Sequence, residues 1–157
     1  MKSNFWLMNH LVNPMLRVLL RSPLHGLLSD SLLLLTYRGK KSSKQYTLPV
    51  QYARIGQAFY IVPGLPERKV WWRNLTGGAP VDLWVRGEKL AAQAQVVSGK
   101  QDESDRVDGL LAYFTRFPAA AQARGLRRSP DGSLGRDEVR SAAQQIIVVQ
   151  ATLRPNA

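Results

Sequence analysis

The chain has 157 residues, of which 45% are hydrophobic and 21% charged, a balance that excludes a disordered chain and predicts a single domain over residues 1–157. Because there is no cysteine, and His10 and His25 are the only histidines, the sequence excludes disulfides and thiolate chemistry and disfavours a histidine-rich metal site or a Ser-His-Asp triad. The formal net charge of +11, concentrated in residues 1–100 with 14 basic and 4 acidic side chains, predicts an anionic partner: a nucleic acid, a membrane surface or a polyanionic small molecule.

The first element that we expect is an apolar helix over residues 4–21, which residues 22–30 connect to a body over 31–157. Pro14 and a stripe of polar residues make this helix unsuited to spanning a bilayer. The segment also lacks the basic start and the cleavage site of a secretory signal, so we expect a cytoplasmic protein. The helix either packs on the domain or a second subunit, or makes a peripheral membrane contact through Trp6.

Three strands are expected next. Residues 32–37 hold four leucines in a row and predict a fully buried strand. Residues 46–54 alternate between apolar and polar side chains, as a half-buried strand does, and Pro49 within them favours an edge, a bulge or a rim that faces a ligand. A turn over residues 55–57 leads into a third strand over residues 58–62.

The loop between the first two of these strands is cationic. It follows Gly39 and contains Lys40, Lys41, Ser42, Ser43 and Lys44. Ammonium groups, hydroxyls and backbone N–H groups beside a glycine can bind an anion, most simply a phosphate. The alternative is an ordinary solvated hairpin tip, since the spacing of a Walker P-loop is absent.

After a loop over residues 63–68, residues 69–75 predict one or two helical turns that end at Gly77 and Gly78. The adjacent tryptophans Trp71 and Trp72 would point about 100° apart on a helix. One of them can therefore face a groove while the other fills the core, although both could also be core residues.

The remaining pattern predicts strands over residues 81–86, 89–97 and 144–153, a helix from Asp102 onward and a short helix over residues 118–125, with a polar segment over residues 127–137. Six strands in meander-like order with peripheral helices indicate an α+β fold. A small antiparallel barrel is the natural way for such a sheet to remove its edges.

Two ordered motifs resemble the deazaflavin (coenzyme F420)-dependent nitroreductase family. The first is Thr-Tyr-Arg-Gly-Lys-Lys-Ser over residues 36–42, followed by Pro49, and the second is Trp-Trp-Arg-Asn-Leu over residues 71–75, followed by Pro80. The resemblance covers roughly residues 30–97. It implies a split β-barrel of the FMN-binding type, a homodimer, and hydride transfer from reduced F420 to a hydrophobic acceptor such as a quinone or a nitroaromatic. Related split-barrel proteins bind FMN, haem or biliverdin, so a carrier or an FMN-binding protein is the alternative.

The resemblance also assigns residues to the site. The loop would bind the phosphate and the acidic tail of F420, the prolines and their neighbours would line the deazaflavin ring, and the tryptophans would pack beside the ring. Asn74 would fix the turn. Tyr46 and Tyr113 are candidates for a proton relay or a substrate contact. The cofactor-binding residues that we expect are Lys40, Lys41, Ser42, Ser43, Tyr46, Pro49, Val62, Pro63, Gly64, Lys69, Trp71 and Trp72.

The sequence departs from the family pattern at three places. Ser43 stands where the family has glycine, and Tyr46 stands where an arginine is expected. The loop before the tryptophans is shorter, and Tyr113 is the lone tyrosine in the C-terminal helical region. Binding of a nucleic acid, the other function that the charge suggests, lacks a helix-turn-helix, zinc or RNA-recognition motif and is disfavoured.

Overall fold

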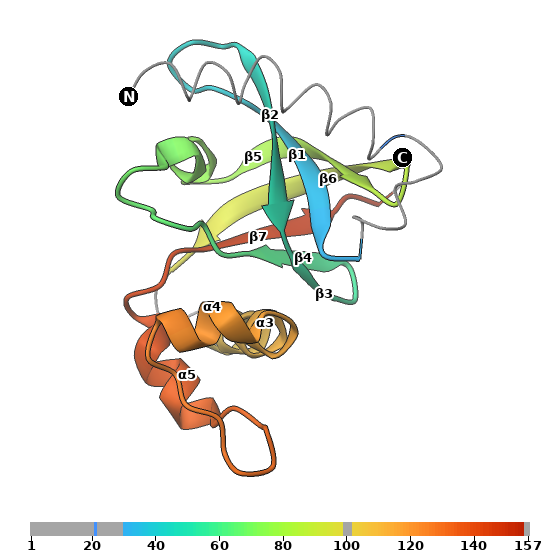
Figure 1. The fold of residues 1–157 in the computed structure, drawn as a ribbon. Coiled ribbons are helices and arrows are strands. Elements are labelled where there is room, and N and C mark those ends of the chain that lie inside the picture. Colours follow the sequence, from blue (N-terminus) through green and yellow to red (C-terminus); the bar gives the residue numbers. More distant parts are fainter. Residues whose placement is uncertain (1–20, 22–29, 99–101, 156–157) are drawn as a thin grey trace, which may run out of the picture.

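The computed structural model describes residue 21 and residues 30–98 and 102–155, so the expected N-terminal helix and both histidines lie outside the described residues. The described part is an antiparallel sheet with α-helices on one side (Figure 1). Its strands are β1 (Leu32–Arg38), β2 (Gln45–Gln51), β3 (Ala53–Ile55), β4 (Ala58–Ile61), β5 (Ala79–Val85), β6 (Glu88–Val97) and β7 (Val148–Leu153). Its helices are the 3-10 helix η3 (Val70–Leu75), α3 (Glu103–Arg116), α4 (Pro118–Ala123) and α5 (Arg136–Ala143).

The sheet has seven strands in the order β2-β1-β5-β6-β7-β4-β3, where six were expected. The difference lies at residues 46–54, which form two strands instead of one. β2 pairs with β1, and β3 pairs with β4 at the opposite end of the sheet. The two strands are separated by Tyr52, which belongs to neither of them.

This break shapes the sheet. β2 and β3 are the two ends of the strand order, yet only Tyr52 separates them along the chain. The sheet must therefore curl until its two ends meet at that residue. Figure 1 shows β2 crossing the front of the sheet to reach β3 and β4. The position of β2 at an end of the sheet agrees with the edge expected from Pro49, because proline cannot donate a hydrogen bond to a neighbouring strand.

Two groups of buried side chains hold the fold together. The inner cluster fills the curled sheet and includes Leu33, Leu35, Phe59, Leu83 and Val149. The outer cluster lies between the sheet and the helices and includes Tyr60, Leu110, Tyr113, Phe114 and Val139. Leu34 is buried as well, so β1 is covered on both faces, as its four leucines predict.

The helical region contains one element that the sequence pattern did not reveal. α5 begins at the end of the segment over residues 127–137 that was expected to be polar, and it continues through residues 138–143, to which no element was assigned. Only Val139 and Ala143 are buried in it, at i and i+4, which is too short a pattern to stand out in the sequence. Among the described residues no helix is long and apolar enough to cross a membrane.

Candidate functional site

The cationic loop between β1 and β2 closes on itself through its backbone. The N–H of Gly39 donates to the carbonyl of Lys44 at 2.8 Å, and the N–H of Ser43 donates to the carbonyl of Gly39 at 2.9 Å. Ser43 has φ +56°, a left-handed conformation that glycine adopts at lower cost. The geometry therefore gives a reason for glycine at this position in the family pattern. Here serine adopts the same left-handed backbone conformation.

The loop presents its charge to solvent. Lys41, Ser42 and Lys44 are exposed, and residues 31–66 contain no aspartate or glutamate. Among the described residues, no carboxylate lies within ion-pair distance of either lysine. The Ser42 Oγ lies 3.1 Å from the Tyr46 hydroxyl and accepts a hydrogen bond from the Lys44 N–H at 3.3 Å. The loop is thus ordered by its own polar groups while its cations remain uncompensated.

Asn74 joins this loop to the 3-10 helix η3. Its Oδ1 accepts a hydrogen bond from the N–H of Lys40 at 3.0 Å, and its Nδ2 donates to the carbonyl of Trp71 at 3.0 Å. The ammonium group of Lys40 donates to the carbonyl of Thr76, just after η3. The two sequence motifs, some thirty residues apart, therefore form one hydrogen-bonded unit.

A row of aromatic rings lies beside this unit. Tyr46 stacks on Tyr37 with ring centroids 5.5 Å apart, and Tyr37 lies 6.3 Å from the Trp71 ring. Burial, together with the neighbouring Tyr46, raises the pKa of the Tyr37 hydroxyl above its usual value of 10.0. Tyr37 is therefore a neutral hydrogen-bonding group at physiological pH.

The second tryptophan connects η3 to the loop that precedes it. The Trp72 Nε1 donates to the carbonyl of Pro66 at 3.1 Å, and the Arg73 guanidinium carbon lies 5.4 Å from the centroid of the Trp72 ring. The backbone N–H of Lys69 donates to the carbonyl of Leu65 at 2.9 Å. Both tryptophans also pack against the inner cluster, so neither side chain lies wholly in a groove.

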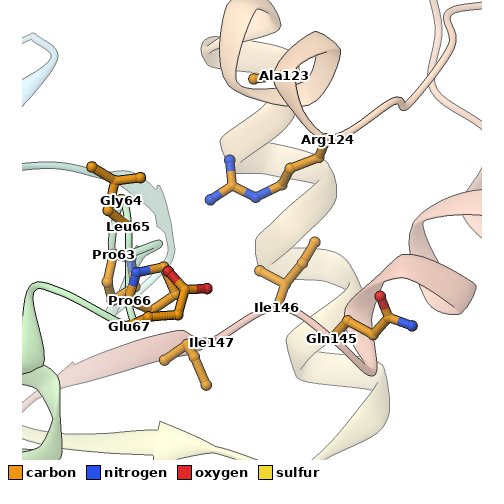
Figure 2. A pocket seen from close by; sticks show the side chains of 10 residues that line it. All are labelled: Pro63, Gly64, Leu65, Pro66, Glu67, Ala123, Arg124, Gln145, Ile146 and Ile147. Atoms are coloured by element: carbon orange, nitrogen blue, oxygen red, sulfur yellow. The ribbon is translucent and has the colours of Figure 1, made fainter.

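A cleft opens on the other side of the Pro66 loop. Its volume is about 520 Å³, within the range of small-molecule sites. Figure 2 shows one wall formed by the loop after β4 and the other formed by the end of α4 and the connection into β7. The lining residues are Pro63, Gly64, Leu65, Pro66, Glu67, Ala123, Arg124, Gln145, Ile146 and Ile147.

The cleft contains two of the expected site residues, Pro63 and Gly64, while Val62 is buried in the outer cluster. Sequence reasoning did not identify the opposite wall. Arg124 and residues 145–147 lie more than fifty positions away along the chain, and they reach the cleft only through the packing of the helices. The one local signal was Arg124 at the end of a predicted short helix, directly before Gly125.

The two candidate tyrosines lie far apart. Tyr46 packs on Tyr37 beside the inner cluster, whereas the Tyr113 hydroxyl donates to the Gln51 Oε1 at 3.5 Å on the other face of β2. Tyr46 and Gln51 are five residues apart on β2, about 17 Å in an extended strand. The described structure therefore does not bring Tyr46 and Tyr113 into one relay. Pro49 shares the face of Gln51.

Comparison with known proteins identifies a family. A protein-family model described as F420H(2)-dependent quinone reductase matches residues 21–112, which is more than half of the chain and includes both motifs. The comparison with curated proteins finds no match.

A solved structure described as a domain-swapped dimer shows the same fold. It aligns with a TM-score of 0.57 and 18% identity, over 88% of this chain and 94% of the other. Two further solved structures align less closely. An F420-H2 dependent reductase (FDR-A) has a TM-score of 0.47 and 18% identity, over 80% of this chain and 96% of the other. An FAD and heme binding protein from Mycobacterium smegmatis has a TM-score of 0.45 and 18% identity, over 78% of this chain and 60% of the other.

Proposed function

The chain belongs to the F420H(2)-dependent quinone reductase family, and from this premise we propose which of its residues serve the reaction. The family is one of oxidoreductases that use reduced F420. We propose that the loop over residues 39–44 binds the anionic tail of the cofactor and that the deazaflavin ring lies along η3 toward Pro63 and Gly64.

The charge of the loop fits the cofactor tail. F420 carries a phosphodiester and a glutamate tail, both of which favour cations and N–H donors. Lys41 and Lys44 are exposed and have no carboxylate partner among the described residues. Ser42, Ser43 and the backbone of the closed loop add donors. Lys40 offers fewer free donors than Lys41 or Lys44, because one of the three N–H donors of its ammonium group already bonds the Thr76 carbonyl, although its charge is retained.

Asn74 is the observation that carries this proposal. It bonds Lys40 in the loop and Trp71 in η3, and Trp72 in the same helix bonds Pro66 at the cleft. A cofactor whose tail binds the loop over residues 39–44 therefore lies next to η3, which is joined to Pro66 at the cleft. Lys69, at the start of η3, stabilises the same segment through its backbone bond to Leu65.

The residues of this chain would then bind, orient and exclude water, whereas the cofactor supplies the hydride. The tryptophans and the prolines form the apolar surroundings. Tyr46, hydrogen-bonded to Ser42, remains a candidate contact to the cofactor. Tyr113 remains a candidate proton donor, with its hydroxyl held by Gln51 and kept protonated because burial raises its pKa. We propose nitroaromatics as further acceptors and FMN as an alternative cofactor.

We also propose the type of fold, the oligomeric state and the cellular location of the protein. The curled antiparallel sheet supports a split β-barrel, with residues 1–157 as one domain. A homodimer is supported by the solved structure described as a domain-swapped dimer. The proposed location is the cytoplasm, and a peripheral membrane contact through residues 4–21 is the alternative to packing of this segment on the protein.

The proposal is tested by titrating the protein with F420 and following the fluorescence of the cofactor. Wild type should show saturable binding at micromolar concentration. The double variant Lys41→Ala/Lys44→Ala should weaken binding by at least about 10-fold, because each lost charge-assisted contact is worth about 1.5–3 kcal/mol.

The matched control is Lys89→Ala, which removes a lysine of β6 that pairs with Asp82 and lies opposite Trp84, near the end of β5 that is away from the loop. It should bind F420 like wild type. Absence of saturable binding to wild type would refute the proposed function. Equal affinities of wild type and the double variant would refute the assigned position of the tail.

A further inference from the structure

The cleft has a combination of features that the cofactor tail does not explain. Most of its lining is apolar, and it contains one cation, Arg124, and one carboxylate, Glu67, from opposite walls. Figure 2 shows Arg124 extending from the end of α4 across the cleft toward the loop that carries Glu67. A polyanionic tail would be repelled by Glu67 and would find only one cation here. A neutral, mainly apolar molecule with a hydrogen-bond acceptor fits this lining better.

The wall opposite Arg124 holds an exposed apolar residue in a strained conformation. Leu65 has φ +50°, and the residue is 58% exposed. A bulky residue other than glycine is uncommon in the left-handed region. Because this leucine is exposed to water, it also gains no free energy from hydrophobic burial. Two hydrogen bonds fix this conformation, since the N–H groups of Arg68 and Lys69 both donate to the Leu65 carbonyl at 2.9 Å. Strain of this kind is concentrated at ligand sites.

The Arg124 side chain is held in place by neighbouring groups, but its positive charge is not neutralised by a carboxylate among the described residues. Its Nη1 donates to the carbonyl of Ala120 at 3.2 Å, and its guanidinium carbon lies 5.7 Å from the centroid of the Phe114 ring. No carboxylate pairs with it in the part of the chain that the structure describes. Because a guanidinium has five N–H donors, several remain for a ligand in the cleft.

We propose that this cleft binds the quinone acceptor and that Arg124 donates hydrogen bonds to one of its carbonyl oxygens. The proposal rests on the proposed function and adds to it the place and the polar contact of the substrate. The ring and chain of the quinone lie between Leu65 and Ile146. Glu67 does not oppose a neutral quinone, so the cleft selects the acceptor against the anionic tail of the cofactor.

The chemistry gives Arg124 a catalytic role. A quinone becomes a quinol by accepting a hydride and one proton, and transfer of the hydride places negative charge on a quinone oxygen before the proton arrives. The proton comes from the candidate donor Tyr113 or from solvent, and Arg124 keeps its own proton throughout, since a guanidinium is not deprotonated in proteins. A fixed cation at the oxygen that gains charge stabilises the transition state more than the ground state.

Binding of the quinone alone can be measured without cofactor. Trp72 donates to the carbonyl of Pro66, which lines the cleft, so quenching of protein fluorescence by menadione reports on binding. Arg124→Leu should raise the dissociation constant of menadione by about 3- to 10-fold, because one hydrogen bond is lost. Arg124→Lys should stay close to wild type, and so should Arg127→Leu, which removes an exposed cation three residues away.

Steady-state kinetics with F420H2 and menadione complete the test. Arg124→Leu should lower kcat by about 10- to 100-fold, as expected for the loss of a donor to developing charge, while the dissociation constant of F420 stays unchanged. Equal kinetics of Arg124→Leu and wild type would overturn this inference and leave the proposed function standing. Loss of F420 affinity in Arg124→Leu would also overturn it, by making Arg124 a cofactor contact. A wild-type protein that neither binds F420 nor reduces menadione would overturn both proposals.

Discussion

At the scale of single residues, the amide of Asn74 has the largest organising role in the proposed site. Its oxygen and nitrogen bond two different segments, the loop at Lys40 and η3 at Trp71. An asparagine suits this position because it combines an acceptor and a donor in one planar group. Its position beside the tryptophans was visible in the sequence. Its contact with Lys40 was not, since 34 residues separate the two.

Asn74→Ala tests this role. The change removes both hydrogen bonds, each worth about 0.5–1.5 kcal/mol, and leaves the loop free of η3. We expect the affinity for F420 to fall by about 10-fold, measured by titration of the cofactor fluorescence, with the circular dichroism of the folded protein retained. Thr76→Ala is the control, because Thr76 contacts Lys40 only through its main-chain carbonyl. Wild-type affinity in Asn74→Ala would show that the link does not position the loop for the cofactor.

At the scale of elements, the distance between α3 and the sheet depends on one glycine. Gly109 lies in the middle of α3, and a Cβ at this position would lie 2.1 Å from the Cδ1 of Tyr60. Tyr60 cannot easily move, since it is buried and its hydroxyl accepts a hydrogen bond from the Gln150 Nε2 at 3.2 Å. The helix therefore approaches the sheet closely because residue 109 has no side chain.

Gly109→Ala is expected to destabilise the fold, although alanine favours a helix by about 1 kcal/mol over glycine. Forcing a methyl group into a packed core costs about 1–3 kcal/mol or more, and here the overlap is with a ring that is held in place. Urea denaturation should show a net loss of about 1–2 kcal/mol. Gly135→Ala is the matched control, because its Cβ would make only an ordinary contact, 3.8 Å from Glu138. A more stable Gly109→Ala variant would contradict the close packing of α3 on Tyr60.

At the scale of the whole molecule, both hydrophobic clusters contain tyrosines that must stay neutral. Burial raises the pKa of Tyr37 in the inner cluster and of Tyr60 and Tyr113 in the outer cluster above the usual value of 10.0. Asp105 and Asp108 raise the pKa of Tyr60 further, whereas the charge of Arg124 opposes the rise at Tyr113. These three hydroxyls lose their protons more readily in the unfolded chain than in the folded protein.

The stability of the protein should therefore depend on pH in the alkaline range. Well below about pH 10 the three tyrosines are protonated in both states and contribute no pH dependence. As the pH rises through about 10, the unfolded state releases protons first, so the free energy of unfolding falls. Urea denaturation, repeated at several values from about pH 8 to about pH 11.5 so that the range spans the tyrosine pKa of unfolded chains, should show this decline. Ionisation of all five tyrosines near pH 10 in the folded protein, seen as tyrosinate absorbance, would contradict it.

Much of the fold followed from local patterns. The leucines of β1, the alternation in β2 and the glycines after η3 each determine the conformation of their own segment, because side-chain periodicity and backbone freedom depend on neighbours in the chain. The last strand, β7, begins at Val148 and not at residue 144, and α5 has too few buried residues for its period to appear. The resemblance to the family rested on the same two local motifs.

The sequence by itself determined the cationic loop, the tryptophan helix and the family to which they belong. Only the tertiary structure decided how the loop and the helix are joined, that residues 46–54 divide at Tyr52, and that Arg124 faces the loop over residues 63–67 across a cleft. The physical reason is the curl of the sheet, the packing of α3 on β3 and β4, and the packing of α4 and α5 on α3. These features bring together residues that lie far apart in the chain. No local periodicity relates such residues, so their contacts depend on the whole fold.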